Sequence, residues 1–269
     1  FHYITNGLKQ AKAVAAGKTD ICAGINTTSI IIAAGTNIKL NIIRAACNPT
    51  GTLALMTTKP NIKSVKDLKG KTIVGPSGAT LHQLLLAALL KNNMTIKDVN
   101  FIPMSLAETY NAMSRKDVGA VLLTTAEMLK AEKQGARVLT TAKGLMRPKL
   151  VVATSESFAQ KHPEWVKRYI KIQDEAMAFI KNHKHEALEL AAKDLGISYQ
   201  DAEWLYNNTK FINTLDRDDI ISLRKDIDFL YQQKLIPRKV NILSKGAGIE
   251  LAFENFVRDQ ISICAISHK

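Results

Sequence analysis

Paired threonines recur in this chain directly after two short apolar runs. They are Thr27 and Thr28 in TDICAGINTTSI, and Thr124 and Thr125 in KDVGAVLLTTAEM. The same offset of 97 positions aligns a further set of identical residues: Ala15, Asp20 and Ala23 with Ala112, Asp117 and Ala120. A strand that passes into a helix through two threonines presents hydroxyl and N–H groups at its carboxyl end, where open α/β sheets bind ligands. The repeat therefore indicates either two similar ligand-binding lobes or two α/β units that have converged on similar sequences.

A small, turn-prone segment, PSGAT, joins the apolar run KTIVG to the helical run LHQLLLAALL. The first turn of a helix carries N–H groups without an intrahelical acceptor, together with the positive end of the helix dipole, so this entry suits an anion. The same residues could instead cap the helix through Ser77 or Thr80, and both interpretations stay open on sequence grounds. No GK[ST] follows, so the segment is not a nucleotide-binding P-loop.

The ionisable residues do not form a recognisable catalytic or metal-binding set. His82 has no partner at metal-ligand spacing and is expected to be structural, while His183 and His185 fall in a charged junction and are expected to be solvated. Glu108 and Glu127 lie near the predicted ligand site, but no HExxH or GxSxG motif is present. We therefore expect no enzyme activity, no metal and no cofactor.

The charge balance is strongly basic, with 37 Lys and Arg against 24 Asp and Glu and a net charge of +13 over 269 residues. Both signs are interleaved along the helical runs, and only 6% of residues are aromatic, which disfavours a nucleic-acid partner and favours an exported protein or one that handles small anions. Cys22, Cys47 and Cys264 form no CxxC pair, and the first two are typical of core positions. No signal peptide is recognisable, and no apolar run approaches the ~20 residues of a membrane span.

Short apolar runs alternate with helical patterns as far as Thr154, which predicts α/β layers with mainly parallel sheets. The expected strands are TDICAGI, LNIIRAAC, TLALMTT, KTIVG, NFIPM, VGAVLLT, ARVLTTA and KLVVATS. The expected helices between them are LKQAKAVAAG, TLHQLLLAALLKNN, LAETYNAMSR and TTAEMLKAEKQG. Residues 157–235 read as almost entirely helical, and their larger aromatic residues are expected to pack in the core: Trp165, Tyr169, Trp204 and Tyr206.

The stretch SVKDLKGKTIVGPSGATLHQLLLAALLKNNMTIKDVNFIPM resembles the periplasmic substrate-binding proteins of ABC importers, in particular the group for sulfonates, taurine, nitrate and thiamine precursors. The DLKGK turn, the strand, the Gly- and Ser-containing helix entry with a nearby His, and the DV before the next strand occur in the same order. LKQAKAVAAGKTDICAGINTTSIIIAAGTNIK and KLVVATSESFAQKHPEWVKRYIKIQDEAMAFI match further segments of that group.

This resemblance implies an α/β, two-lobed type II periplasmic-binding-protein fold with a helical C-terminal part. Lobe one would comprise residues 1–74 and 151–269 and lobe two residues 75–150, with crossings near Val74–Pro76 and Arg147–Val151. Two departures from the family are expected to matter. The opening strand and helix that normally precede FHYIT are absent, which leaves an unpaired sheet edge that invites dimerisation. The helix-entry Ser of the family aligns with Ala79, so one hydroxyl donor is lost.

The resemblance further implies a solute-binding component of an ABC import system, which captures a small anionic organic molecule between its lobes and delivers it to a membrane permease from a periplasmic or extracytoplasmic location. The expected ligand contacts are uncharged donors: Asn26, Thr27, Thr28, Thr50, Gly51, Ser77, Gly78, Ala79, Thr80, Ser105, Thr124 and Thr125. Two alternatives remain, namely the effector-binding lobes of a transcription regulator and an enzyme on the same fold. The enzyme would resemble the pyrimidine-forming enzyme of thiamine synthesis, whose cysteine-rich motif is missing here.

Overall fold

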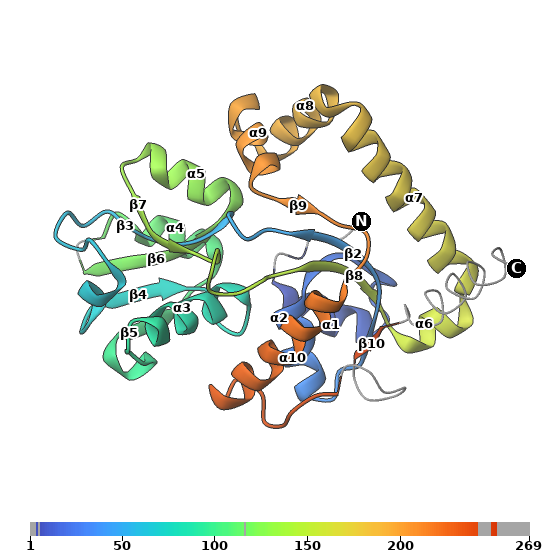
Figure 1. Cartoon of the computed structure of the whole chain (residues 1–269), viewed down its shortest axis with the longest axis horizontal. Helices are drawn as coiled ribbons and strands as arrows, with labels where there is room; N and C mark the ends of the chain where they lie inside the picture. The colour runs from blue at the N-terminus through green and yellow to red at the C-terminus, as the bar shows by residue number, and fades with distance from the viewer. Residues whose placement is uncertain (1–3, 5, 116, 242–248, 252–269) are drawn as a thin grey trace, which may run out of the picture. The chain divides into compact units, whose positions relative to one another are not determined.

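The chain forms two compact units in a computed structural model that describes residues 4, 6–115, 117–241 and 249–251 (Figure 1). Unit 1 consists of Phe1–Ala46, Leu150–Glu175 and Ile212–Lys269. Unit 2 consists of Cys47–Lys149 and Ala176–Phe211. Each unit builds its own sheet and its own hydrophobic core.

Unit 2 is built on a five-stranded sheet with the strand order β5-β4-β6-β3-β7. The strands are β3 (Leu53–Thr57), β4 (Thr72–Gly75), β5 (Asn100–Pro103), β6 (Val118–Thr124) and β7 (Arg137–Thr141). Strand β4 pairs in parallel with β5 and with β6, whereas β3 pairs antiparallel with β6 and with β7. The sheet is therefore mixed, and its parallel half lies around β4.

Helices cover both faces of this sheet, and successive residues of each strand alternate between two cores. Leu53 and Leu55 join the core under α3 (Thr80–Lys91), while Ala54 and Met56 join the core under α4 (Leu106–Ala112) and α5 (Thr125–Lys133). Figure 1 shows α3 on one side of the strands and α4 and α5 on the other. Because neither face meets water, the strands are continuously apolar instead of alternating with polar residues.

Two further helices of unit 2 pack on each other, and the second of them packs on α5. They are α8 (Lys184–Leu195) and α9 (Tyr199–Asn207), and α9 is tied to α5 by the ion pair of Lys133 with Asp201 and by Trp204, which packs against the core under α5. Two single-turn helices, η1 (Val65–Leu68) and η2 (Ile96–Asp98), precede β4 and β5. The short strand β9 (Lys210–Phe211) pairs antiparallel with Cys47 and Asn48.

Unit 1 has a sheet with the order β1-β8-β2-β10, in which β1 and β8 are antiparallel and β10 and β2 are parallel. The strands are β1 (Ile21–Asn26), β2 (Leu40–Asn48), β8 (Leu150–Thr154) and β10 (Ile249–Leu251). Three helices enclose the core: α1 (Gly7–Ala15), α2 (Thr27–Gly35) and α10 (Arg217–Gln232). All residues of α2 are buried, which explains why TTSIIIAAG lacks the polar stripe by which a surface helix is recognised.

Helix α7 (Pro163–Asn182), which follows α6 (Glu156–Lys161), has no buried residue. Polar contacts attach it to β2: Asp174 pairs with the largely buried Arg44, and the Gln173 side chain donates to the Ala45 carbonyl at 2.7 Å. Trp165 is 52% exposed, with the Arg168 guanidinium 5.5 Å from its ring centre. The expectation that Trp165 is a core residue is therefore wrong, because the apolar face of α7 turns this ring outward. Trp204, by contrast, packs against a core, while Tyr169 and Tyr206 are half-buried.

The unit boundaries differ from the expected lobes. β3 and β4 belong to the same sheet as β6, so the first crossing lies between Ala46 and Cys47, well before the expected Val74–Pro76. The later boundary between Lys149 and Leu150 falls within the expected Arg147–Val151. Residues 176–211 were expected in lobe one but belong to unit 2, because α9 packs on α5.

Every strand expected between Thr19 and Ser155 is present, and so are the four expected helices among them. Capping boxes form at Ser64 and at Ser198. The strand expected at FHYIT and the residue Cys264 lie outside the described residues, apart from Ile4. In the part of the chain that the structure describes, no helix combines the length and the hydrophobicity needed to span a membrane.

Candidate functional site

The carboxyl ends of two neighbouring parallel strands form one edge of the unit 2 sheet. Val74 of β4 pairs with Val121 of β6, so both strands end on the same side. A Cβ atom on Gly75 would lie 2.6 Å from the Cβ of Leu122, so the close approach of the two strands requires glycine at this position. The end of β5 joins the same edge, because the Met104 N–H donates to the Gly75 carbonyl at 2.9 Å. The loops that follow β4, β5 and β6 therefore all lie at this edge of the sheet.

The loop after β4 opens α3 without a side-chain cap. Ala79 is the N-cap residue, and it has no side-chain oxygen with which to cap the helix. Gly78 has a φ of 63°, a left-handed conformation that a side chain would strain. Within the described part of the chain, the N–H groups of Ala79 and Leu81 meet no hydrogen-bond acceptor. This helix start therefore offers unpaired donors, as the sequence indicated.

The loop after β6 leads into α5 with a strained backbone conformation at Thr125. Thr124 is the N-cap residue, yet its hydroxyl does not cap the helix and instead donates to the Thr52 carbonyl at 2.8 Å. The Thr125 N–H donates to the same carbonyl at 2.9 Å. Thr125 has a φ of 45°, a conformation that is costly for a β-branched residue. The strand β3, which begins at Leu53 beside Thr124, thus fixes the start of α5 at this edge.

The missing caps distinguish these two helices from most others. A side-chain acceptor caps each of the helices α1, α2, α4, α6, α9 and α10. No such bond is made at the starts of α3, α5 and α8. Only α3 and α5, of these three, follow the adjacent strands β4 and β6. Two uncapped positive helix ends therefore lie on one edge of the sheet, which is a suitable arrangement for binding an anion.

Three of the other residues expected at the site have structural roles at the same edge. Gly51 lies in the turn before β3, where a Cβ atom would come within 2.9 Å of the Asn208 side-chain oxygen. Thr50 is half-buried in the same turn. The Ser105 hydroxyl accepts the Glu108 N–H at 3.3 Å, while the Glu108 carboxylate accepts the Ser105 N–H at 2.8 Å. Ser105 is thus engaged in a capping box, and its bonds hold the pKa of Glu108 below the usual value.

The first copy of the repeat lies in unit 1, at the start of α2. The Asn26 side-chain oxygen caps α2 by accepting the Ser29 N–H at 2.8 Å, and Thr27 and Thr28 are both 2% exposed. Both copies of the repeat thus form a strand followed by a helix, but the N-cap of the helix falls one aligned position earlier in the first copy. The N-cap is Asn26 in the first copy, and in the second it is Thr124, which aligns with Thr27. Sequence reasoning missed Ser29, whose fully buried hydroxyl has no partner within the described chain and lies beside Gly7.

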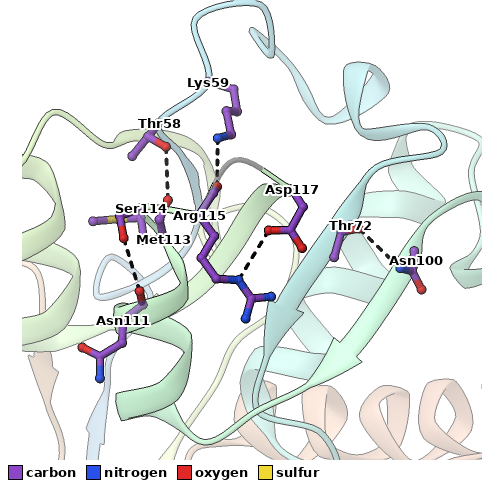
Figure 2. A network of polar contacts seen from close by, with 9 residues as sticks. All are labelled: Thr58, Lys59, Thr72, Asn100, Asn111, Met113, Ser114, Arg115 and Asp117. Atoms are coloured by element: carbon purple, nitrogen blue, oxygen red, sulfur yellow. Dashed lines mark hydrogen bonds and ion pairs between the residues drawn. The ribbon is translucent and has the colours of Figure 1, made fainter.

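Polar contacts join the segments at the opposite end of the unit 2 sheet, where β4, β5 and β6 begin (Figure 2). The Lys59 ammonium donates to the Arg115 carbonyl at 3.0 Å, and the Arg115 Nε lies 3.4 Å from an Asp117 oxygen. The Asn100 side chain donates to the Thr72 hydroxyl at 3.3 Å. Asp117 is the acidic residue of the second repeat copy, so that part of the repeat serves the start of β6 and not the ligand edge.

Other candidate positions are less suited to binding a ligand. An open hollow of about 520 Å³ beside α4 is lined by Glu108 and Arg115 among others, but the charges of both are engaged in the contacts described above. His183 and His185 are exposed, as expected. No cluster of potential metal ligands occurs among the residues whose positions are described.

Comparison with known proteins identifies the family of this chain. The family model described as NMT1/THI5 like matches residues 3–187, which is more than half of the chain. The chain belongs to the NMT1/THI5-like family. A Bacillus subtilis (strain 168) relative, named as an aliphatic sulfonates-binding protein, is 26% identical over 244 residues, which are 88% of this chain and 72% of that protein. The resemblance to periplasmic substrate-binding proteins is thereby confirmed.

Solved structures share the fold of this NMT1/THI5-like chain. The alkanesulfonate-binding protein SsuA from Xanthomonas axonopodis pv. citri, bound to MOPS, superposes with a TM-score of 0.79 at 20% identity, covering 88% of this chain and 83% of that one. DSZB in complex with biphenyl-2-sulfinic acid has a TM-score of 0.69 at 13% identity, covering 94% and 90%. DSZB is a desulfurization enzyme, so this fold occurs in binding proteins and in enzymes alike. The type II periplasmic-binding-protein fold is confirmed.

The two described thiols of this NMT1/THI5-like chain are not activated nucleophiles. Cys22 and Cys47 are buried, and burial raises the pKa of each thiol to about 11. Both are therefore protonated at neutral pH, whereas a catalytic cysteine acts as the thiolate. They are core residues, as the sequence indicated.

Proposed function

We propose that this protein is the solute-binding component of an ABC import system and that it captures a small organic anion of the sulfonate class. The site would be centred on unit 2, at the starts of α3 and α5. Ser77, Ala79 and Thr80 at the start of α3 would contribute the first set of contacts, and the Thr125 side chain with the N–H groups that follow it in α5 would contribute the second. Release would occur to a membrane permease outside the cytoplasm.

The observation that carries this proposal is the pair of uncapped helix starts beside each other on one sheet edge. A capped helix end has its donors satisfied, whereas these two present N–H groups and the positive ends of two dipoles. A sulfonate group is a compact anion with oxygens that accept several N–H bonds. The name of the Bacillus relative and the MOPS-bound structural neighbour, itself a sulfonate complex, support the same ligand class.

Thermal melting of the purified protein against ethanesulfonate, taurine, MOPS and nitrate tests the proposal. A ligand present at 100 times its dissociation constant should stabilise the folded protein by about 2.7 kcal/mol, which gives a readily measured shift. Absence of a shift with every compound, in a sample with a cooperative transition, would contradict the proposed ligand class.

A single substitution locates the site. Ala79→Asp places a carboxylate at the N-cap of α3, where it should satisfy the helix donors and stabilise the unliganded protein by about 1 kcal/mol, while repelling an anionic ligand and abolishing its shift. His183→Asp is the matched control, because it caps α8, which is also uncapped but lies away from the sheet edge. Ligand binding that survives Ala79→Asp would place the site elsewhere.

A further inference from the structure

His82 makes two contacts that fix its ring at the start of α3. Its Nδ1 atom accepts the N–H of Gly78 at 3.3 Å. Its ring stacks on Phe101 of β5, with the ring centres 4.8 Å apart and the planes inclined by 13°. The hydrogen bond joins the third residue of the helix to the residue before the N-cap, and the stack holds the ring against the neighbouring strand.

The hydrogen bond defines the state of the imidazole. Nδ1 accepts an N–H, so it carries no proton, and the proton of the neutral ring resides on Nε2. Burial lowers the pKa of His82, which keeps the ring neutral at neutral pH. The positive end of the helix dipole also disfavours an imidazolium at this position. His82 is therefore a stable acceptor and not a charged group for the ligand.

The position of this bond differs from that in an ordinary capping box. There the side chain of the third helical residue accepts the N–H of the N-cap residue itself. Here His82 accepts the N–H of Gly78 instead, and the Ala79 N–H stays without a partner within the described chain. The bond thus restrains the left-handed turn at Gly78 while it leaves the donors of the helix start available.

We propose that His82 is a positioning residue for the anion site, which holds the loop Ser77–Ala79 in the conformation that leaves the Ala79 N–H available to a ligand. The inference rests on the proposed function and deepens it. His82 itself does not touch the ligand. Its contribution is preorganisation: without the bond the glycine turn samples other conformations, and binding must order the loop at a cost in affinity.

Three variants separate the hydrogen bond from the stack. His82→Leu removes the acceptor and keeps an apolar side chain beside Phe101. His82→Asn can place its carbonyl oxygen where Nδ1 lies, so it restores the acceptor without the ring. His82→Gln carries its carbonyl one atom further out, and serves as the matched polar control that lacks the correct geometry. Calorimetric titration with ethanesulfonate gives the dissociation constants, melting reports folding, and hydrogen exchange of the Gly78 amide reports the bond.

We expect His82→Leu and His82→Gln to weaken ethanesulfonate binding about tenfold and to speed exchange at Gly78, whereas His82→Asn stays within about threefold of the wild type. The ¹⁵N shifts of His82 in the wild type should show the proton on Nε2. Unchanged affinity in the Leu variant, or equal losses in the Asn and Leu variants, would overturn the role of the bond while the proposed function stands. A wild-type protein that binds no sulfonate would instead overturn the proposed function, and this inference with it.

Discussion

Thr125 and Thr28 occupy equivalent positions in the repeat but have different backbone conformations. Thr125 has a φ of 45°, whereas Thr28 is not among the described residues with a positive φ. The difference follows from the cap, because Asn26 starts α2 one position earlier than Thr124 starts α5 in the aligned repeat. The strained copy lies at the edge proposed to bind the ligand, and strain of this kind is often retained where function requires it.

We expect Thr125→Gly to raise the free energy of unfolding by up to about 1 kcal/mol, because relief of the left-handed strain exceeds the entropy cost of glycine. Thr28→Gly is the matched control and should lower it by about 1 kcal/mol, since glycine weakens an ordinary helix. Denaturant unfolding of both variants measures the two changes. Equal destabilisation would show that Thr125 is not strained.

The individual residue roles were only partly predictable from sequence. The donors at Ser77–Thr80 followed from a glycine-containing turn before a strong helix, which is a local signal. The hydroxyl of Thr124 was expected to face a ligand, but it donates to the Thr52 carbonyl across the sheet. The His82 ring likewise stacks on Phe101 of β5. Such contacts join residues distant in sequence, so no local pattern reveals them.

Helix and turn starts away from the proposed site are held by acidic capping boxes. Hydrogen bonds from the Lys63 and Ser64 N–H groups lower the pKa of Asp67, and those from Thr95 lower the pKa of Asp98. These two boxes precede β4 and β5, and so position the amino ends of the strands whose other ends form the proposed ligand site.

The capping carboxylates should make stability fall at acid pH. The pKa of each capping carboxylate is lower in the folded state than in the unfolded chain. Its contribution to the free energy of unfolding is therefore complete above the pKa in the unfolded chain, about 4, and is lost as the pH falls through the pKa in the folded protein. We expect Asp67→Asn to melt at a lower temperature than the wild type at about pH 7, and the difference to shrink steadily as the pH falls below about 4. Asp194→Asn, on an exposed residue at the far end of α8, is the control and should show no such pattern. A difference that persists at low pH would contradict the capping role.

The elements were far more predictable than the boundaries of the units. Each expected strand was marked by a continuous apolar run, because the sheets are covered on both faces. Helix α2 was indicated only by the threonine pair at its start, since it has no polar face. Residues 176–211 were expected in the other lobe, since their attachment to α5 depends on Trp204 and on the ion pair of Lys133 with Asp201. Periodicity identifies an element, whereas partner choice depends on contacts that periodicity does not encode.

The whole molecule carries a net charge of +13, which sets the long-range field met by an approaching solute. The proposed ligand contacts are uncharged, so this charge acts on association more than on the bound state. A positive field attracts a monoanion and has little effect on a zwitterion.

We therefore expect salt to slow the association of ethanesulfonate more than that of taurine. Raising the ionic strength from about 0.01 M to about 0.1 M shortens the screening length from ~30 to ~10 Å. Stopped-flow association rates at the two ionic strengths measure the effect, and taurine, whose net charge is zero at neutral pH, is the internal control. Equal salt dependence for both ligands would show that the net charge does not steer binding.

The chain passes between its two units at several points, so the two units are not completed at the same time during synthesis. All strands of the unit 2 sheet lie within one continuous stretch, from Leu53 to Thr141. The core of unit 1 begins in α1 but also requires β8 and α10, which ends at Gln232. The ribosome therefore releases a complete set of unit 2 strands while the first helices of unit 1 still await their partners. Helix α1 is therefore among the last elements whose core residues become buried.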